Sequence, residues 1–455
     1  MAHSHSHGPL TLPRKRLRRI RIFLAAIVLP LAVATAVGMW MLWPSGEQSP
    51  VGSIPAYSPG TVPTKAEVTS LNPDDCPNPL KANQPEMPDS PPPSDAYQPR
   101  SPSAVCAMVL DGDHTGENVS IQTPPEVYAS VEVGTVMKVL QSAPFPDAPA
   151  IYFYWDIERS SPMLWLIALY LVLVVVVARW RGAAAIAGLG ASILVLVYFI
   201  MPALMANQPA LLTTLVGVSA MLFLSVYFAH GVSIRTTTAL LGTFGGIVLT
   251  VTLALWETKA IHLSGASSED AQLIFGFLPD VNLSALLVCG IVIAGLGALN
   301  DVTITQASAV WELHAANPSM GRAKLFARAM RIGRDHIAST VYTLAFAYAG
   351  GALPALLLAL MVNRPAWDII VSGAIAEEIV RTLIASIGLI VSIPLTTLIG
   401  TVLVLLTSTE GEDESNDPDH AHDTEDTGDD RAREPHAPRA LGGRHARLTP
   451  EPGDS

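Results

Sequence analysis

Charged residues are scarce in this chain. Only 15% of its 455 residues are charged, whereas half are hydrophobic. This balance argues against a wholly soluble protein and is typical of a membrane protein with soluble appendages. The sequence also shows no nucleotide-binding loop, metal cage or catalytic triad, and Gly295 and Gly297 follow no strand that could make them part of a nucleotide motif. We therefore expect no enzyme, no cofactor and no nucleic-acid partner.

The formal net charge of −12 is concentrated at one end of the chain. Residues 410–430 hold eleven Asp or Glu and no Lys or Arg. This composition predicts a disordered acidic tail over residues 408–455. The opposite terminus, residues 1–19, is basic and contains alternating histidines. Histidines in both tails could bind Zn²⁺ or Ni²⁺ weakly, but we interpret the tails as disordered and predict no metal site.

Long apolar stretches are the most informative feature. About 20 apolar residues in a helix cross a hydrocarbon core of about 30 Å, and a helix pairs its backbone groups within itself. We predict eight membrane-spanning helices: 20–43, 162–178, 183–204, 209–229, 237–256, 280–299, 337–361 and 383–407. The apolar part of residues 366–381 is short, so this segment could be interfacial, re-entrant or part of a longer final helix.

Basic residues flank these stretches in alternation. They precede the first span at Arg14–Arg21 and recur at 179–182, at Arg235 and at 322–334. Because basic loops stay in the cytoplasm, the sequence predicts that both termini are cytoplasmic. A cleaved signal peptide ending near Ala34–Ala36 is the alternative for the first span. Its apolar run is longer than a signal core, so we favour a retained anchor.

The segment between the first two spans should be extracytoplasmic and has two parts. Residues 44–104 contain fifteen prolines, which predicts an extended linker without strands. Residues 105–158 carry alternating and β-branched residues, which predicts a small β-domain of four or five strands, one of them within Val127–Val133. A disulfide between Cys76 and Cys106 would tie the linker to the first strand; two free thiols are the alternative.

Polar residues in the helical region form the first candidate site. Asp301, Thr305, Ser308 and Glu312 recur at offsets that share one face of a helix, which should continue to about Asn317. An acid at the edge of a span is costly unless it is hydrated or paired, and it could hold a cation or carry a proton. The alternative is a helix cap or a solvent-facing edge. We select as candidate ion- or substrate-binding residues Asp301, Thr305, Gln306, Asp335 and His336.

A second charged cluster precedes the last span, on the side predicted to be external. Glu378 and Arg381 are three residues apart and should meet on one helix face, beside Glu377 and Thr382. Arginine is disfavoured on this side of the membrane, so Arg381 should be paired, with Glu378 as its partner. We predict that this pair forms an outer gate. An interfacial salt bridge that orients the helix is the alternative.

Three segments in order carry a family resemblance: Leu299–Ser308, Gly333–Thr340 and Glu378–Leu383, with Gly388–Pro394 fitting the same pattern. They resemble the YibE/F family of bacterial multi-pass membrane proteins over about residues 105–407. The resemblance implies a protein of the bacterial cytoplasmic membrane. It brings no established biochemical activity, and the linker and both tails lie outside it.

The expected fold is an all-α polytopic membrane protein with about eight transmembrane helices and a small extracytoplasmic β-domain. The leading hypothesis is a transporter of a small solute or ion, coupled to protons or cations, because acids at both mouths suit such a carrier. The alternative is a non-transporting envelope scaffold or signalling protein that displays the β-domain, and an intramembrane enzyme is third. Expected partners are the lipid bilayer, a small solute or cation, and a second copy or an envelope protein.

Overall fold

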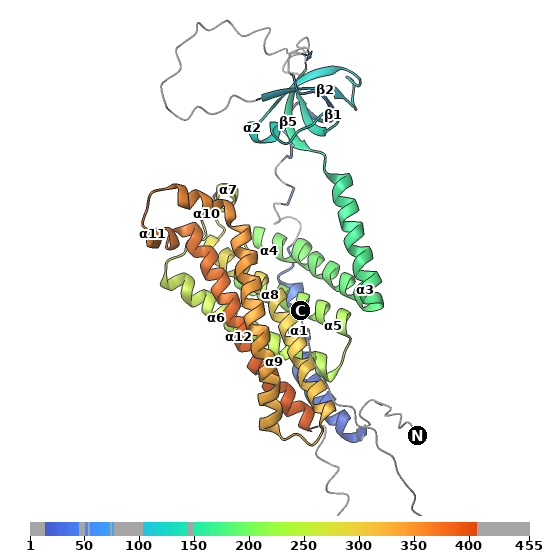
Figure 1. The fold of residues 1–455 in the computed structure, drawn as a ribbon, viewed down its shortest axis with the longest axis vertical. Coiled ribbons are helices and arrows are strands. Elements are labelled where there is room, and N and C mark those ends of the chain that lie inside the picture. Colours follow the sequence, from blue (N-terminus) through green and yellow to red (C-terminus); the bar gives the residue numbers. More distant parts are fainter. Residues whose placement is uncertain are drawn as a thin grey trace, which may run out of the picture. The chain divides into compact units, whose positions relative to one another are not determined.

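The described residues form a small β-barrel and a set of long helices (Figure 1). The computed structural model describes residues 14–44, 51–52, 55–72, 75–76, 103–142 and 150–406, with side chains from Arg18 onwards. The predictions for the start of the chain and for the acidic tail fall largely outside the described residues. Most of the predicted linker also lies outside them.

Five strands close into a barrel in the described part of the chain. They are β1 (Thr61–Ser70), β2 (Ser103–Val109), β3 (Asn118–Thr123), β4 (Val136–Ser142) and β5 (Ile151–Ile157). Their order around the barrel is β1-β2-β3-β5-β4, and each neighbouring pair is antiparallel except β3 with β5. A five-stranded barrel with such a crossover has the architecture of the OB-fold.

Alternating residues fill the barrel. On β1, Thr64, Ala66 and Val68 are buried, whereas Lys65 between them is exposed. This period of two is that of a strand with one face on a core. The core consists of Ala66, Val68, Val105, Ala107, Val109, Ile121, Val131, Met137, Val139 and Tyr152. The barrel therefore has a hydrophobic interior of its own.

The prediction of a strand-free linker is wrong at β1. This strand lies within residues 44–104 and pairs with both β2 and β4. Its one proline, Pro63, pairs with Leu140 of β4 on one edge of the strand. The other edge is open at this point, because the pairing of β1 with β2 starts only at Ala66. Proline is tolerated where one edge of a strand is open. The proline count of the whole segment therefore concealed a ten-residue stretch that can pair.

The strand predicted within Val127–Val133 is also wrong. A short helix, α2 (Pro125–Tyr128), begins this segment, and Pro125 occupies its first turn. Proline is favoured there because its fixed φ suits a helix and its missing N–H would be unpaired anyway. The side chain of Val131 still enters the barrel core. The apolar residues of this segment thus cover the barrel from a helix and a turn.

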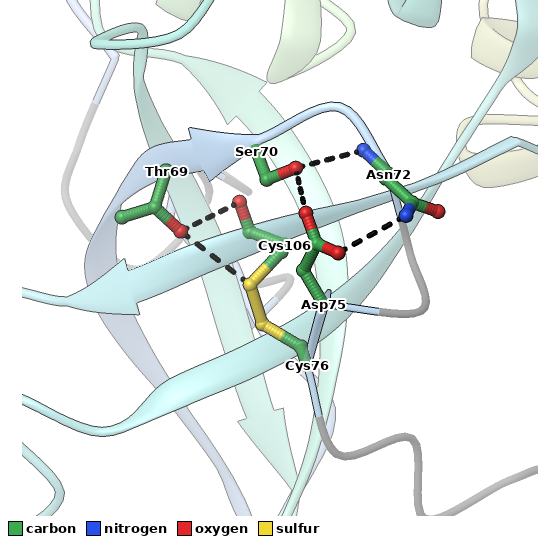
Figure 2. The surroundings of a disulfide bond; sticks show 6 residues. All are labelled: Thr69, Ser70, Asn72, Asp75, Cys76 and Cys106. Atoms are coloured by element: carbon green, nitrogen blue, oxygen red, sulfur yellow. Dashed lines mark hydrogen bonds between the residues drawn. A yellow bond between two sulfur atoms is a disulfide. The ribbon is translucent and has the colours of Figure 1, made fainter.

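Cys76 and Cys106 form a disulfide, with their Cα atoms 5.4 Å apart (Figure 2). The bridge joins the segment after β1 to the middle of β2. Hydrogen bonds among Ser70, Asn72 and Asp75 shape the turn that brings Cys76 to the strand, with Asn72 Nδ2 donating to Asp75 Oδ1 at 3.0 Å (Figure 2). The bridge and this turn together hold the end of β1 against the barrel.

Glu158 links three parts of the barrel just after β5. Its carboxylate lies 3.3 Å from Lys65 Nζ on β1 and 3.5 Å from Lys138 Nζ on β4. It also accepts hydrogen bonds from the hydroxyl and the backbone N–H of Ser160. The Ser160 hydroxyl, then its backbone N–H, and then the two lysines lower the pKa of Glu158 from 4.5 to about 2.

We expect the barrel to lose stability in acid because of this carboxylate. A group whose pKa is lowered by folding stabilises the folded state above its unfolded pKa and loses that contribution as the pH falls. The loss should therefore occur between pH 4.5 and about 2. The midpoint of urea unfolding, measured by tryptophan fluorescence at a series of pH values, should fall less in this range for Glu158→Gln than for the wild type. Glu126 is exposed, so Glu126→Gln should give the same midpoints as the wild type. Identical profiles for Glu158→Gln and wild type would contradict the prediction.

Ten α-helices in the described residues make up the rest of the fold. Two of the labelled segments, α3 (Ser160–Val195) and α4 (Met201–Met205), are joined by a π-helical turn, η3 (Leu196–Ile200), and count as one helix. The other nine are α1 (Arg14–Met41), α5 (Ala210–His230), α6 (Ile234–Ala260), α7 (Glu269–Phe277), α8 (Leu283–Ala316), α9 (Arg322–Gly351), α10 (Leu353–Met361), α11 (Ala366–Ile370) and α12 (Gly373–Leu406). The helices α5, α6, α8 and α12, with Leu344 of α9, supply the buried residues of the main apolar core.

Six helices within the described residues are long and apolar enough to cross a membrane, and the bent pair α9–α10 makes a seventh if it is one span. The chain is therefore a membrane protein with several apolar helices. The predicted spans 162–178 and 183–204 both fall within residues 160–205, which are counted as one of these six helices. Arg179 in this helix has φ 56° and ψ −137°, so the helix is kinked there, between the two predicted spans.

The end of the helical region settles the ambiguous segment 366–381. Its first part is the short helix α11, and from Gly373 onwards it belongs to α12. The final helix therefore begins ten residues before the predicted 383, because the charges at Glu377, Glu378 and Arg381 interrupt the apolar pattern without interrupting the helix. The helices α9 and α10 are bent by 64° relative to each other, and Pro354 in the first turn of α10 lies directly after the break, as is common at sharp helix kinks.

Candidate functional site

The predicted face of α8 is polar and open. Asp301 is exposed, and Thr305 lies one turn further along with its hydroxyl donating to the Asp301 carbonyl at 2.8 Å. The helix ends at Ala316 with Asn317 as its cap, as predicted. Asp301 also acts electrostatically on His230 at the end of α5, together with Arg235 and Arg181. The carboxylate of Asp301 is thus the negative group in a largely basic neighbourhood.

Gln306 does not belong to this open face. It is 1% exposed, and its amide nitrogen donates to the Ala329 carbonyl at 3.0 Å and to Thr397 Oγ1 at 2.7 Å. It therefore fastens α8 to α9 and α12. Gly333 makes room for it, since a Cβ at Gly333 would lie 3.1 Å from Gln306 Oε1. The structure thus separates Gln306 from Asp301 and gives it a packing role.

Asp335 and His336 lie on α9, where Asp335 is exposed and His336 is half-buried. Among the described residues, no ion pair joins Asp335 to Arg334 or to any other basic group. The described residues also contain no group of three His, Cys, Asp or Glu arranged to hold a metal ion. No described hydrogen bond or ion pair gathers the five predicted binding residues into one site.

The second cluster does come together. Arg381 Nη1 lies 3.3 Å from Glu378 Oε2, and both side chains are about a quarter to a third exposed. Tyr348 on α9 interacts electrostatically with both members of the pair. The sequence spacing therefore located this ion pair correctly, and α9 contributes a neighbour that the sequence did not reveal.

Glu377 is the one buried acid among the residues that the structure describes. Its side chain lies at the start of α12, the residue is 9% exposed, and it accepts a hydrogen bond from Ser267 Oγ at 2.7 Å. Ser267 precedes α7 and is 110 residues away in sequence. Two adjacent glutamates cannot be told apart by sequence alone, because burial depends on which one faces the bundle. Only the tertiary structure identifies Glu377 as the buried one.

One face of α12 continues from Glu377 into the bundle as a stripe of small and hydroxyl residues. Offsets of three and four place Arg381, Ala385, Gly388, Ser392 and Thr396 on this face. The glycines of α6 meet it closely: a Cβ at Gly242 would lie 1.9 Å from Thr396 Oγ1, and one at Gly246 would lie 3.1 Å from Ser392 Cβ. We call this contact the α6–α12 seam.

Hydroxyl groups continue from the seam to α8. Thr243 Oγ1 on α6 lies 2.6 Å from Thr303 Oγ1 on α8, and both residues are fully buried. Gly295 on α8 lies opposite Ala385 on α12. Counting 1.5 Å per residue from these positions, the level of Asp301 is about 21 Å from that of Glu377 along the helices. The two acids therefore lie at different depths, and by the same count Ser392 and Thr396 of the seam lie at or beyond the depth of Asp301, on the side away from Glu377.

Comparisons with known proteins bear on the helical part of the chain. No curated protein and no solved structure matches the chain. The model of the YibE/F-like protein family matches residues 166–405. This range is narrower than the expected 105–407 and leaves the barrel outside, but it covers more than half of the 455 residues. The chain therefore belongs to the YibE/F-like family.

Proposed function

We propose that this protein is a membrane carrier for a small solute or cation, coupled to protons or cations. The observation that supports it best is the buried carboxylate of Glu377, which lies on the same α12 face as the hydroxyl-lined seam. Ionisable groups within membrane helices are expensive and mark ion or proton pathways. A carboxylate partly withdrawn from water can exchange a proton or a cation as its surroundings open and close.

The proposal gives the remaining polar residues separate roles. Asp301 is the acceptor group at the other depth, on the side where basic loops predict the cytoplasm. Glu378 and Arg381 form the gate beside Glu377, because parting them would let water reach the buried acid. Gln306 acts as a structural fastener and is no longer proposed as a ligand. Asp335 and His336 remain at the predicted cytoplasmic mouth.

The test begins with the unknown substrate. A thermal-stabilisation screen of the purified protein across ions and small metabolites should find a ligand, and flux of that ligand is then measured in proteoliposomes. We expect Asp301→Asn and Glu377→Gln to fold and to lower flux at least tenfold. A tenfold loss corresponds to an increase of about 1.4 kcal/mol in the activation free energy of transport. Both replacements keep the size of the side chain and remove its charge.

Asp270→Asn is the matched control, since it removes an exposed acid from α7 near the same end of the bundle as Glu377. It should keep wild-type flux. Unchanged flux in both Asp301→Asn and Glu377→Gln would remove the acids from the mechanism. If no ion or metabolite binds the protein and none crosses the vesicle membrane, the protein is not a carrier for the compounds screened.

The barrel favours a second candidate function, a scaffold that presents a binding surface. Phe153 and Trp155 on β5 are about half exposed, and Tyr57 packs edge-on against Trp155 at 5.5 Å between ring centroids. Clustered exposed aromatic residues are typical of interaction sites. Deleting residues 44–158 separates the two functions, because a carrier should keep basal flux without the barrel and a scaffold should lose its role.

A further inference from the structure

An open groove of about 930 Å³ lies between α1, α5, the start of α6, the end of α8 and the end of α12. It is distinct from the acids of the proposed carrier site. Most of its lining is aliphatic or aromatic, as at Leu24, Val28 and Phe223. Three charged side chains, Arg21, Arg235 and Glu312, also line it.

The charged residues lie together at one end of the groove. Arg21 is near the start of α1, Arg235 is near the start of α6, and Glu312 is near the end of α8. The apolar residues Ile20, Ile234 and Trp311 belong to one packed cluster, which brings these three helix ends to the same level. Within the described residues, neither arginine forms an ion pair. Two guanidinium groups therefore remain available to an anion there.

The length of the groove matches one leaflet of a bilayer. Its lining on α1 extends from Arg21 to Ala32, which is about 16 Å at 1.5 Å per residue. Half of a hydrocarbon core of about 30 Å is about 15 Å. A chain whose head is held at Arg21 would therefore end near the bilayer centre. An apolar groove as deep as one leaflet, with two arginines at its end, is complementary in shape and charge to an anionic lipid.

We propose that this groove binds one anionic phospholipid from the leaflet on the Arg21 side. Arg21 and Arg235 hold the phosphate, because guanidinium groups pair well with phosphate oxygens. One acyl chain lies along Leu24, Val28 and Ala32. Glu312 accepts hydrogen bonds from headgroup hydroxyls, which favours a glycerol headgroup over a bare phosphate. The bound lipid then joins α1 to the bundle at the side where basic residues predict the cytoplasm.

The test uses thermal unfolding of the purified full chain in detergent with added lipid. Dioleoyl phosphatidylglycerol should raise the unfolding midpoint by about 5 °C more than dioleoyl phosphatidylcholine does. Inorganic phosphate should not reproduce the shift, because it lacks the acyl chains. The double variant Arg21→Gln/Arg235→Gln should lose most of the difference between the two lipids.

The matched control is Arg322→Gln/Arg328→Gln, which removes the same charge from exposed positions of α9 that do not line the groove. It should keep the full lipid difference. Ala32→Trp tests the apolar end without altering charge, and it should also abolish the difference; it serves if the arginine variant does not fold. Equal shifts from both lipids, equal losses in both arginine variants, or a lipid difference that survives Ala32→Trp would overturn the proposal.

Discussion

Replacing Gly242 by alanine should destabilise the helical bundle by about 1–3 kcal/mol, the usual cost of overpacking a core. An added Cβ would lie 1.9 Å from Thr396 Oγ1, 2.9 Å from Thr396 Cβ and 3.3 Å from Thr396 Cα. A rotating hydroxyl could relieve only the first of these contacts, so α6 and α12 must separate. In a helix, alanine is more favourable than glycine by about 1 kcal/mol. A net loss of stability in Gly242→Ala would therefore come from the clash with Thr396.

Two further variants make this result specific to the seam. Gly297→Ala on α8 is the matched control, since no atom lies within 4 Å of its added Cβ, and it should hold or raise stability. Adding Thr396→Ala to Gly242→Ala removes the nearest clashing atom and should restore part of the loss. The unfolding midpoint of purified protein in detergent measures all three. Wild-type stability of Gly242→Ala would show that α6 and α12 are less tightly packed.

Loss of the disulfide should destabilise the barrel by about 3–4 kcal/mol. The bridge closes a loop with a sequence separation of 30, and the chain-entropy relation gives about this free energy for such a loop. The paired variant Cys76→Ala/Cys106→Ala should therefore increase hydrogen exchange at the most protected amides of β1 and β2 by about several hundredfold. Mass spectrometry of peptides from these strands measures the change in the full chain.

The third cysteine supplies the control for this experiment. Cys289 is a free, buried thiol in α8, so Cys289→Ala removes a sulfur without opening a loop and should leave exchange in the barrel unchanged. Reduction of the wild-type protein should reproduce the effect of the paired variant. Unchanged exchange in both the paired variant and the reduced protein would show that the barrel is held by its core alone.

The predictable parts of the fold are those specified by local pattern. The course of α8 followed from its apolar run and its polar face, which predicted an end at about Asn317. The strands β2, β3, β4 and β5 followed from alternation and β-branched residues. Closure of the barrel could not be foreseen, because it depends on the pairing of β1 with β4, which lies some seventy residues further along the chain.

The candidate site was predictable only where its partners are near in sequence. The pair of Glu378 and Arg381 followed from a spacing of three residues on a helix. The partner of Glu377 is Ser267, and no local pattern connects them. Gln306 was selected because it adjoins Thr305 in a polar segment, yet its side chain lies on another face of the helix and meets α9 and α12. The apolar groove is formed by five helices from distant parts of the chain.

The Gln306 amide has a mechanical consequence. Its nitrogen has two hydrogens, and its two bonds take one partner from α9 and another from α12. A conformational cycle that preserves these bonds must carry α8, α9 and α12 as a single rigid block.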